Sequence, residues 1–399
     1  MNAAGLQGHF EALGRFLSEH QGLWRPAPFT VLACAWERQH PALADWLRQH
    51  SVEHADAAQA NPYALPAPAP YPALAEHAQA LCELPALPSA AVAAPPQGLA
   101  TGVPGRKWAQ IEAFASHLMF AAPTRQWLDW CAGKGYLARR LAAGGAPARC
   151  LEWDPALVSA GQALSERHGL AVQHLAQDVL AAGAAEQVPA GSTPVALHAC
   201  GDLHLRLLAL ARQAGYPQLA IAPCCYNRTQ AEQYQPLSRA GQASGLHLSR
   251  QDLALPASEA VTAGRHVRRQ RDQSMAFRLA FDLWQRALGG HDRYLNTPSV
   301  PVAWLHKPLR QWCLDMAAVK GLAVATEPDW AHLEQQGWAR LAQVRNLELL
   351  RNLFRRPLEL WLVLDRALYL QEAGYQVQVG TFCPPALTPR NVMILAERR

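Results

Sequence analysis

Between residues 106 and 226, the apolar residues follow two alternating patterns along the chain. Short continuous apolar runs predict buried strands, in residues 124–133, 147–154, 171–178, 193–200 and 219–226. Apolar positions at helical spacing predict the intervening helices, in residues 108–121, 136–145, 155–169 and 203–215. Strands and helices that alternate in this way form a parallel sheet with right-handed crossovers. The sequence therefore predicts an α/β fold with a doubly wound sheet.

Different patterns precede and follow this region. Residues 1–60 carry apolar positions at helical spacing, such as Phe10, Leu13 and Leu17, and predict helices. Two stretches rich in Pro and Ala predict extended linkers around a short helix, in residues 61–74 and 84–98. Beyond the alternating region the pattern is mostly helical, and it ends with a helix and two strands, in residues 357–374, 375–382 and 391–399.

These patterns predict three parts. Residues 1–100 form a helical, proline-rich accessory domain. Residues 101–230 and 356–399 together form one Rossmann-like sheet domain, whose last strand runs antiparallel to the others. Residues 231–355 form a helical insertion, which we expect to act as a lid over a substrate.

Composition excludes some classes of protein. Apolar residues make up 50% of the chain and charged residues 17%, so global disorder is excluded. The net charge of +5 permits a polyanionic partner such as RNA without requiring one. The 9 cysteines form no CxxC pair, which favours a reducing compartment. We find no signal peptide and no apolar run of about 18 residues, so we expect a soluble, cytoplasmic protein.

A glycine loop follows the first predicted strand, in the stretch DWCAGKGYLARRLA (129–142). Ala132, Gly133 and Gly135 leave backbone N–H groups open to a ligand at the start of the next helix. The loop lacks the GK[ST] of a P-loop, and Asp129 would repel a pyrophosphate. An acid suits a cation, such as the ammonium and sulfonium of S-adenosylmethionine (SAM). The alternative is an ordinary βα turn, in which the glycines only keep the turn tight.

Two more acids mark the ends of the next two strands. Asp154 precedes Pro155 and is the expected N-cap of a helix, which leaves Glu152 to accept the hydroxyls of a ribose. Asp178, followed by Val179, lies where the exocyclic amine of an adenine would bind, although Asp178 also suits a helix N-cap. Together with the glycine loop, these acids predict a SAM site.

The fourth and fifth strands end in LHACGDL (197–203) and IAPCCYN (221–227), and ligands of such sheets bind beyond these strand ends. His198 and Asp202 are candidate general bases, and Tyr226 offers a ring face or a hydroxyl. The alternatives are a core histidine, a helix cap and a packing aromatic. We interpret Cys200, Cys224 and Cys225 as small apolar loop residues, and no metal site is predicted.

The methyl acceptor is expected to contact two sets of residues. The first set follows the fifth strand: Pro223, Cys224, Cys225, Tyr226 and Asn227. The second is the basic cluster RHVRRQR, which would hold a phosphate backbone through Arg265, Arg268, Arg269 and Arg271. A solvated helix face explains that cluster equally well.

The chain resembles class I SAM-dependent methyltransferases of the methyltransferase-like family that includes ribosomal RNA adenine dimethylase domain-containing proteins. It is more distantly similar to tRNA 2′-O-methyltransferases that act on the acceptor stem. The resemblance rests on GRKWAQIEAF, DWCAGKGYLARRLA, LHACGDL, APCCY, LVLDRALYLQEAG and FCPPALTPRNVMILA, and covers roughly residues 100–399. It implies SAM as cofactor, bound by Asp129, Ala132, Gly133, Gly135, Glu152 and Asp178, with His198 to Asp202 near the methionine end.

The chain departs from the family pattern at three places. Cys131 stands where the first loop glycine is common, and Cys-Cys-Tyr-Asn replaces the cysteine-histidine run of the tRNA enzymes. The Asn/Asp-Pro-Pro-aromatic motif of adenine N6 enzymes is absent, and His198 to Asp202 occupy its place. We therefore expect a SAM-dependent methyltransferase that acts on RNA. The alternatives are a protein methyltransferase and a SAM-binding or inactive scaffold.

Overall fold

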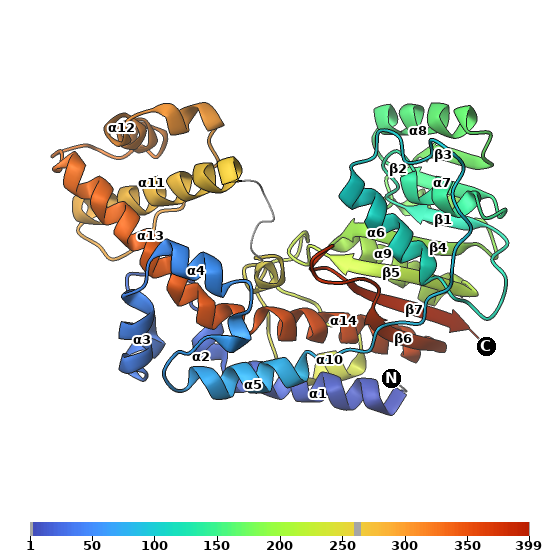
Figure 1. Ribbon diagram of the computed structural model, residues 1–399, viewed down its shortest axis with the longest axis horizontal. Coiled ribbons are helices and arrows are strands. Elements are labelled where there is room, and N and C mark those ends of the chain that lie inside the picture. Colours follow the sequence, from blue (N-terminus) through green and yellow to red (C-terminus); the bar gives the residue numbers. More distant parts are fainter. Residues whose placement is uncertain (1–2, 259–264, 399) are drawn as a thin grey trace. The chain divides into compact units, whose positions relative to one another are not determined.

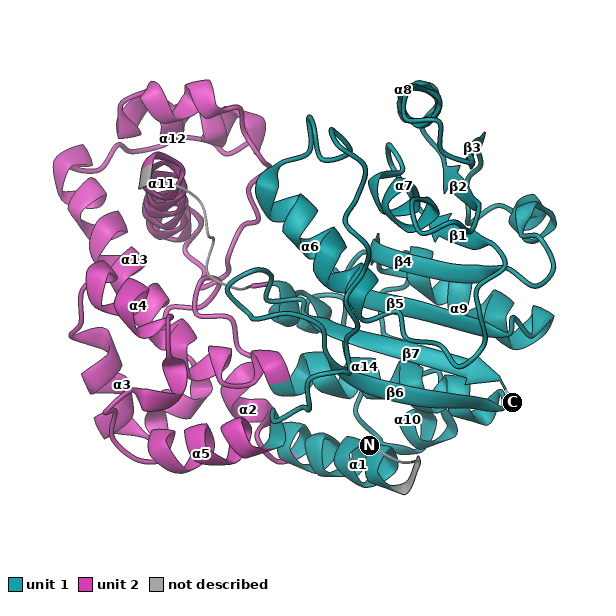
Figure 2. Ribbon diagram, turned by 45° about the vertical axis from the view of Figure 1, so that its right-hand side comes forward, with its two compact units in different colours: residues 1–18, 81–257, 357–399 teal, residues 19–80, 258–356 magenta. Residues whose placement is uncertain are grey.

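The structure is a computed structural model that describes residues 3–258 and 265–398. It divides into two compact units, coloured teal and magenta in Figure 2. Unit 1 consists of residues 1–18, 81–257 and 357–399, and unit 2 of residues 19–80 and 258–356. In the described part of the chain, no helix combines the length and the apolar character needed to span a membrane.

Unit 1 is built on one seven-stranded sheet (Figure 1). Its strands are β1 (Trp127–Trp130), β2 (Ala148–Glu152), β3 (Val172–Ala176), β4 (Thr193–Cys200), β5 (Gln218–Cys224), β6 (Tyr375–Thr381) and β7 (Val392–Arg398). Their order is β3-β2-β1-β4-β5-β7-β6, and β7 runs antiparallel to both neighbours. The predicted Rossmann-like sheet with an antiparallel last strand is therefore confirmed.

Helices cover both faces of this sheet. Residues of α6 (Gly105–Ser116) and α7 (Tyr136–Ala142) share one buried core with β2, β4, β5 and β7. Behind the sheet in Figure 2 lie α9 (Asp202–Ala214) and α14 (Arg355–Glu372). The remaining helical segments of unit 1 are α1 (Ala3–Glu19), α8 (Pro155–Arg167), α10 (Arg239–Ala243), and the 3-10 turns Ala182–Gln187 and Asp252–Ala257.

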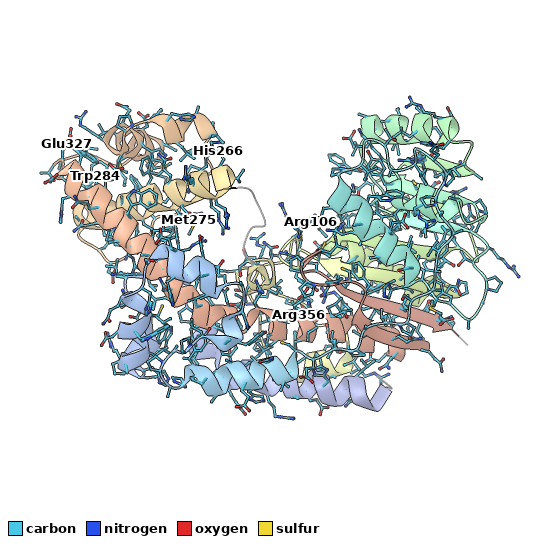
Figure 3. The ribbon with its side chains drawn as sticks, in the orientation of Figure 1. Arg106, His266, Met275, Trp284, Glu327 and Arg356 are labelled. Atoms are coloured by element: carbon cyan, nitrogen blue, oxygen red, sulfur yellow. The ribbon has the colours of Figure 1, made fainter. Side chains whose placement is uncertain are left out.

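Unit 2 is helical. It contains α2 (Gln21–Trp24), α3 (Pro41–Arg48), α4 (Val52–Ala58), α5 (Tyr71–Leu81), α11 (Arg265–Gly289), α12 (Leu309–Val319) and α13 (Trp330–Asn352), with 3-10 turns at Ala35–Arg38, Pro62–Ala64 and Val302–His306. Helices α11 and α13 pack closely because Gly337 has no Cβ, which would lie 2.7 Å from the carbonyl oxygen of Ala276. Aromatic residues fill the core beside them, among them Trp284, labelled in Figure 3.

The two units differ from the predicted domain boundaries. Residues 1–18 belong with the sheet because Phe10 stacks on Trp361 at 5.0 Å. Residues 231–257 also join unit 1, where the carboxylate of Asp365 accepts hydrogen bonds from the backbone of Leu237 and Ser238. Residues 19–80 instead fold with 258–356. These boundaries depend on contacts between residues far apart in sequence, which composition does not reveal.

Candidate functional site

Three residues at neighbouring strand ends have left-handed backbone conformations. Cys131 directly follows β1 with φ 59°, His198 lies near the end of β4 with φ 72°, and Cys225 directly follows β5 with φ 47°. A non-glycine residue in this region costs about 1–3 kcal/mol and persists where the surrounding structure imposes it. Such residues cluster at functional sites. They mark the carboxyl edge of β1, β4 and β5 as the candidate functional site.

The two glycines of the loop after β1 serve different purposes. Gly135 has φ 68°, and a Cβ there would lie 2.4 Å from Cε1 of His174 and 2.9 Å from Sγ of Cys150. Gly133 also has positive φ, but a Cβ there would meet nothing within 4 Å. Gly135 is needed for packing inside the protein, whereas Gly133 borders open space.

Glu152, the last residue of β2, is held in place by three backbone N–H groups. Its Oε2 accepts a hydrogen bond from Gly133 at 2.8 Å. Its Oε1 accepts from Trp153 at 3.0 Å and from Asp154 at 3.2 Å. A carboxylate offers about four lone-pair sites, so one on Oε2 is left for a ligand hydroxyl. Asp154 itself accepts from the Ala156 N–H and is the N-cap of α8, as predicted.

A cavity of about 360 Å³ opens beside this loop. It is lined by Cys131, Leu151, Glu152, Trp153, Gln177, Asp178, Val179 and Leu203. The structure thus brings together three of the predicted cofactor residues: Glu152, Asp178 and Val179. Trp153 is absent from the predicted set, although the residue is 75% exposed and lines the cavity. A large aromatic residue directly after the strand-end glutamate is the sequence signal that would have found it.

Asp129 has a different surrounding from the one predicted. Its side chain is 3% exposed, and its Oδ2 accepts a hydrogen bond from the N–H of Ala138 at 3.1 Å. The first N–H groups of a helix have no partner within the helix, so this carboxyl satisfies one donor of α7. Burial raises the pKa of Asp129 to about 7. Asp129 does not line the cavity, and its carboxyl binds the start of α7 instead.

His198 is part of a hydrogen-bond chain that starts at α6. Its Nε2 lies 2.8 Å from Oε1 of Gln110, whose amide nitrogen donates to the carbonyl of Leu387 at 3.1 Å. Since Oε1 can only accept, Nε2 carries the proton and Nδ1 keeps a lone pair. Partial loss of hydration around the ring, followed by the charge of Lys107, lowers the pKa of His198, which as a residue remains exposed. The imidazole is therefore neutral near pH 7 and has the lone pair of a base.

The loop after β6 is fixed by the same helix. Arg106, labelled in Figure 3, donates from Nε to the carbonyl oxygen of Leu387 at 2.7 Å and from Nη2 to that of Ala386 at 3.2 Å. Helix α6 therefore connects the 386–387 segment with His198 at the end of β4.

Asp202 and Tyr226 hold loops in place. Asp202 is the first residue of α9, and its Oδ2 accepts from the N–H of Gln230 at 2.9 Å. The phenol ring of Tyr226 is buried, with the guanidinium of Arg366 5.0 Å from its centroid and the ring of His204 against it at 6.3 Å. Nε of Arg366 also donates to Nε2 of His204 at 2.8 Å. The stretch LVLDRALYL thus supports the loop after β5 from α14.

A second cavity, of about 670 Å³, lies next to the first because Leu203 lines both. Its other lining residues are Leu180, Cys200, Asp202, Cys225, Asn227, Arg228, Thr229, Gln230 and Arg250. Of the acceptor residues predicted after β5, Cys225 and Asn227 line it, whereas Pro223 and Cys224 are buried within the strand. Its two arginines and one aspartate leave this cavity with one net positive charge.

Three thiols converge beside the second cavity, and two of them, those of Cys200 and Cys225, line it. The Sγ atoms of Cys200, Cys224 and Cys225 all lie within 4.8 Å of one another, and those of Cys200 and Cys224 are 3.5 Å apart. Hydrogen bonds with Cys200 and Cys224 lower the pKa of Cys225, whereas hydrogen bonds with Cys200 and Cys225 raise the pKa of Cys224. The sequence predicts small apolar loop residues here and no such cluster.

The predicted basic cluster belongs to unit 2, on the first two turns of α11. Arg268, Arg269 and Arg271 are exposed there, and burial of part of the Arg271 side chain lowers its pKa. The side chain of Arg265 lies outside the described residues. Arg268, Arg269 and Arg271 line neither of the two cavities described for unit 1.

Comparison with known protein structures gives matches of low similarity. The tRNA (uracil-54, C5)-methyltransferase of Pyrococcus abyssi, solved with S-adenosyl-L-homocysteine, is 14% identical, with a TM-score of 0.24 over 29% of this chain and 28% of that one. An O-methyltransferase family protein from Burkholderia thailandensis is 12% identical, with a TM-score of 0.31 over 73% and 56%. The 23S rRNA methyltransferase ErmE is 16% identical, with a TM-score of 0.25 over 59% and 96%. This chain spans less than two thirds of the length of the first two, and TM-scores this low say nothing about its acceptor.

The amino-acid sequence matches a family model, although no curated protein matches the chain. Residues 106–232, less than half of the chain, match a family model described as a methyltransferase domain. The matched segment contains the glycine loop and every residue that lines the first cavity. This part of unit 1 is thus similar to a methyltransferase domain, and the cofactor that such a domain implies is S-adenosylmethionine.

Proposed function

We propose that this protein uses S-adenosylmethionine to methylate RNA, with the cofactor in the first cavity and the acceptor nucleotide in the second. The observation that carries the proposal is the border that the two cavities share at Leu203. A nucleoside-sized cavity lies on one side of it, and a cavity with Arg228 and Arg250 on the other. A guanidinium pairs well with phosphate oxygens, which favours a nucleic-acid acceptor.

The residues of the first cavity fit the cofactor. The free lone pair of Glu152 would accept a ribose hydroxyl, and the exposed carboxylate of Asp178 would accept from an adenine amine. The indole of Trp153 offers a flat apolar face for the base. Gly133 leaves space beside the loop, where no protein atom lies within 4 Å of a Cβ position. When bound, the cofactor supplies an electrophilic methyl group.

Methyl transfer then needs an acceptor in line with that methyl group and a base for the proton that the acceptor loses. We assign the base to Nδ1 of His198, because its Nε2 proton is held by Gln110 and His198 lies two residues before Cys200, which lines the second cavity. Asp202 and Tyr226 act as positioning residues, since their contacts fix the loop from 225 to 230. The exposed arginines of α11 would contact the phosphate backbone of a longer RNA.

Cofactor binding is tested by isothermal titration calorimetry with SAM. Glu152→Gln removes a charged acceptor and should weaken binding by about 1.5–3 kcal/mol, or roughly 10-fold to 150-fold. Asp154→Asn is the matched control, because this neighbouring acid caps α8 and does not line the cavity. Absence of SAM binding by the wild type, or equal losses in both variants, would overturn the cofactor site.

The acceptor class is tested with tritiated SAM and cell extract. The extract is treated with RNase or protease, inactivated, and then incubated with the protein. We expect incorporation to disappear after RNase and to survive protease. Incorporation that survives RNase and disappears after protease would replace RNA with a protein acceptor. SAM binding without any incorporation would favour a scaffold.

A further inference from the structure

The thiols of Cys200, Cys224 and Cys225 are brought together by the two strained strand ends. Neighbouring residues of a strand point to opposite faces, so Cys224 and Cys225 would diverge in an extended chain. Cys225 instead has φ 47°, and this left-handed turn brings its thiol to the side of Cys224. On β4, the pairing register shifts between Leu197 and Cys200, which places Cys200 opposite Cys224.

This arrangement comes close to a metal-binding geometry. A tetrahedral Zn²⁺ with bonds of about 2.3 Å to sulfur separates its thiolates by about 3.8 Å. The three Sγ atoms lie within 4.8 Å of one another, and the pair across the strands is 3.5 Å apart. Rotations about the Cys side chains are enough to close the difference. In the thiol form, the hydrogen bonds to the carbonyls of His198 and Ala199 are long, at 3.5 and 3.9 Å.

We propose that Cys200, Cys224 and Cys225 form a three-thiolate site for a thiophilic metal ion, with Zn²⁺ as the expected ion. Thiolate ligands select Zn²⁺ and Cu⁺ over the hard ions Mg²⁺ and Ca²⁺. Sites with three protein ligands keep a fourth position for water or substrate. Here that position faces the second cavity, because Cys200 and Cys225 line this cavity while Cys224 is buried behind them.

The surroundings suit such a complex. Three thiolates around a divalent cation leave one net negative charge, and Arg228 of the same cavity supplies a compensating positive charge. No aspartate, glutamate or histidine joins the cluster among the described residues. The fourth ligand would therefore come from solvent or from the molecule in the cavity. The proposal does not depend on SAM, so it stands or fails separately from the proposed function.

The test uses the full-length, reduced protein without SAM. Cd²⁺ is titrated in as the probe, and the ultraviolet thiolate-to-metal charge-transfer band is recorded. We expect saturation at one ion per chain and, with Co²⁺, the visible spectrum of a tetrahedral thiolate complex. A monothiol added to the Co²⁺ form should change this spectrum if the fourth position is open. Unchanged absorption would remove the open position from the proposal.

Single substitutions separate the site from other cysteines. Cys200→Ser and Cys225→Ser should each weaken Cd²⁺ binding by at least about tenfold. Cys383→Ser is the matched control, because Cys383 is half-buried like Cys225 and lies outside the cluster. Circular dichroism confirms that each variant folds. Failure of the wild type to bind one ion, equal losses in Cys383→Ser, or a Cys200–Cys224 disulfide in place of metal binding would overturn the proposal.

Discussion

Gly135→Ala should destabilise unit 1 strongly, and the structure gives the size of the effect. Gly135 has φ 68° at the N-cap of α7, and a Cβ there would lie 2.4 Å from His174 and 2.9 Å from Cys150. The imidazole has little room to move, because its Nε2 is 3.0 Å from Oγ of Ser165 and a Cβ at Gly161 would also lie 2.5 Å from the ring. The ring of His174 therefore packs directly against the backbone at both Gly135 and Gly161.

The cost has two parts. A left-handed alanine costs about 1–2 kcal/mol, and a methyl group forced into a filled site costs about 1–3 kcal/mol. The sum, about 2–5 kcal/mol, is a large share of the roughly 5–15 kcal/mol that stabilises a protein. Gly133→Ala is the matched control, since Gly133 has φ 58° and a Cβ there would touch nothing within 4 Å. Gly133→Ala should lose only the stability that a left-handed alanine costs, about 1–2 kcal/mol.

The assay is urea denaturation followed by far-ultraviolet circular dichroism, with the two variants compared at the same protein concentration. We expect Gly135→Ala to unfold at a lower urea concentration than Gly133→Ala. Its free energy of unfolding should be smaller by about 1–3 kcal/mol. Gly133→Ala should instead weaken SAM binding, because its methyl group enters the space beside the loop. Equal stabilities of the two variants would refute the close approach of Gly135 to His174.

Three further predictions concern other parts of unit 1. Burial raises the pKa of Asp129 to about 7, so the folded carboxyl keeps a proton that the unfolded one releases; stability should fall by up to about 4 kcal/mol as pH rises from about 4 to 7. In Asp129→Asn, the urea midpoints measured between about pH 4 and 7 should not show this loss of stability. Trp153→Ala should change the stability by less than about 0.5 kcal/mol, since the indole is exposed, yet raise the calorimetric Kd for SAM roughly tenfold through lost stacking. Asp365→Ala leaves the hydroxyls of Tyr234 and Ser238 without their buried acceptor and should lower Tm, at a cost of about 3–5 kcal/mol.

The sheet was predictable because its signals are local. Strand β4 occupies residues 193–200, as predicted, and β2 and β3 lie within their predicted ranges. Asp154 followed by Pro155 identifies the start of α8 to the residue, since an N-cap acceptor and a fixed φ are both local requirements. Periodicity and capping need no information about distant residues.

The candidate site was predictable where a strand end alone determines the position. Glu152 and Asp178 line one cavity because the carboxyl ends of neighbouring parallel strands share one edge of the sheet. The direction of a side chain depends on its partners, however. The carboxyl of Asp129 turns towards the N–H of Ala138, and the ring of Tyr226 packs under Arg366. Neither partner can be identified from spacing alone.

The thiol cluster shows a different limit. Strand periodicity places Cys224 and Cys225 on opposite faces of the sheet, where their thiols could not bind the same metal ion. Cys225 departs from this periodicity because it leaves the strand with a positive φ, which non-glycine residues rarely adopt. A pattern-based prediction assigns the common conformation to every residue. It is therefore least reliable at strained strand ends, where functional residues concentrate.

Arg366 explains why a motif on α14, far from the glycine loop in sequence, accompanies the loops of the site. Its guanidinium is almost fully buried, and such a charge is tolerated only when it is well partnered. The partners are the ring faces of Tyr226 and Tyr234 and the Nε2 of His204. His204 lies on α9 just after β4, and Tyr226 follows β5. One buried cation thus fixes both strand ends that border the second cavity, so the geometry of that cavity depends on α14.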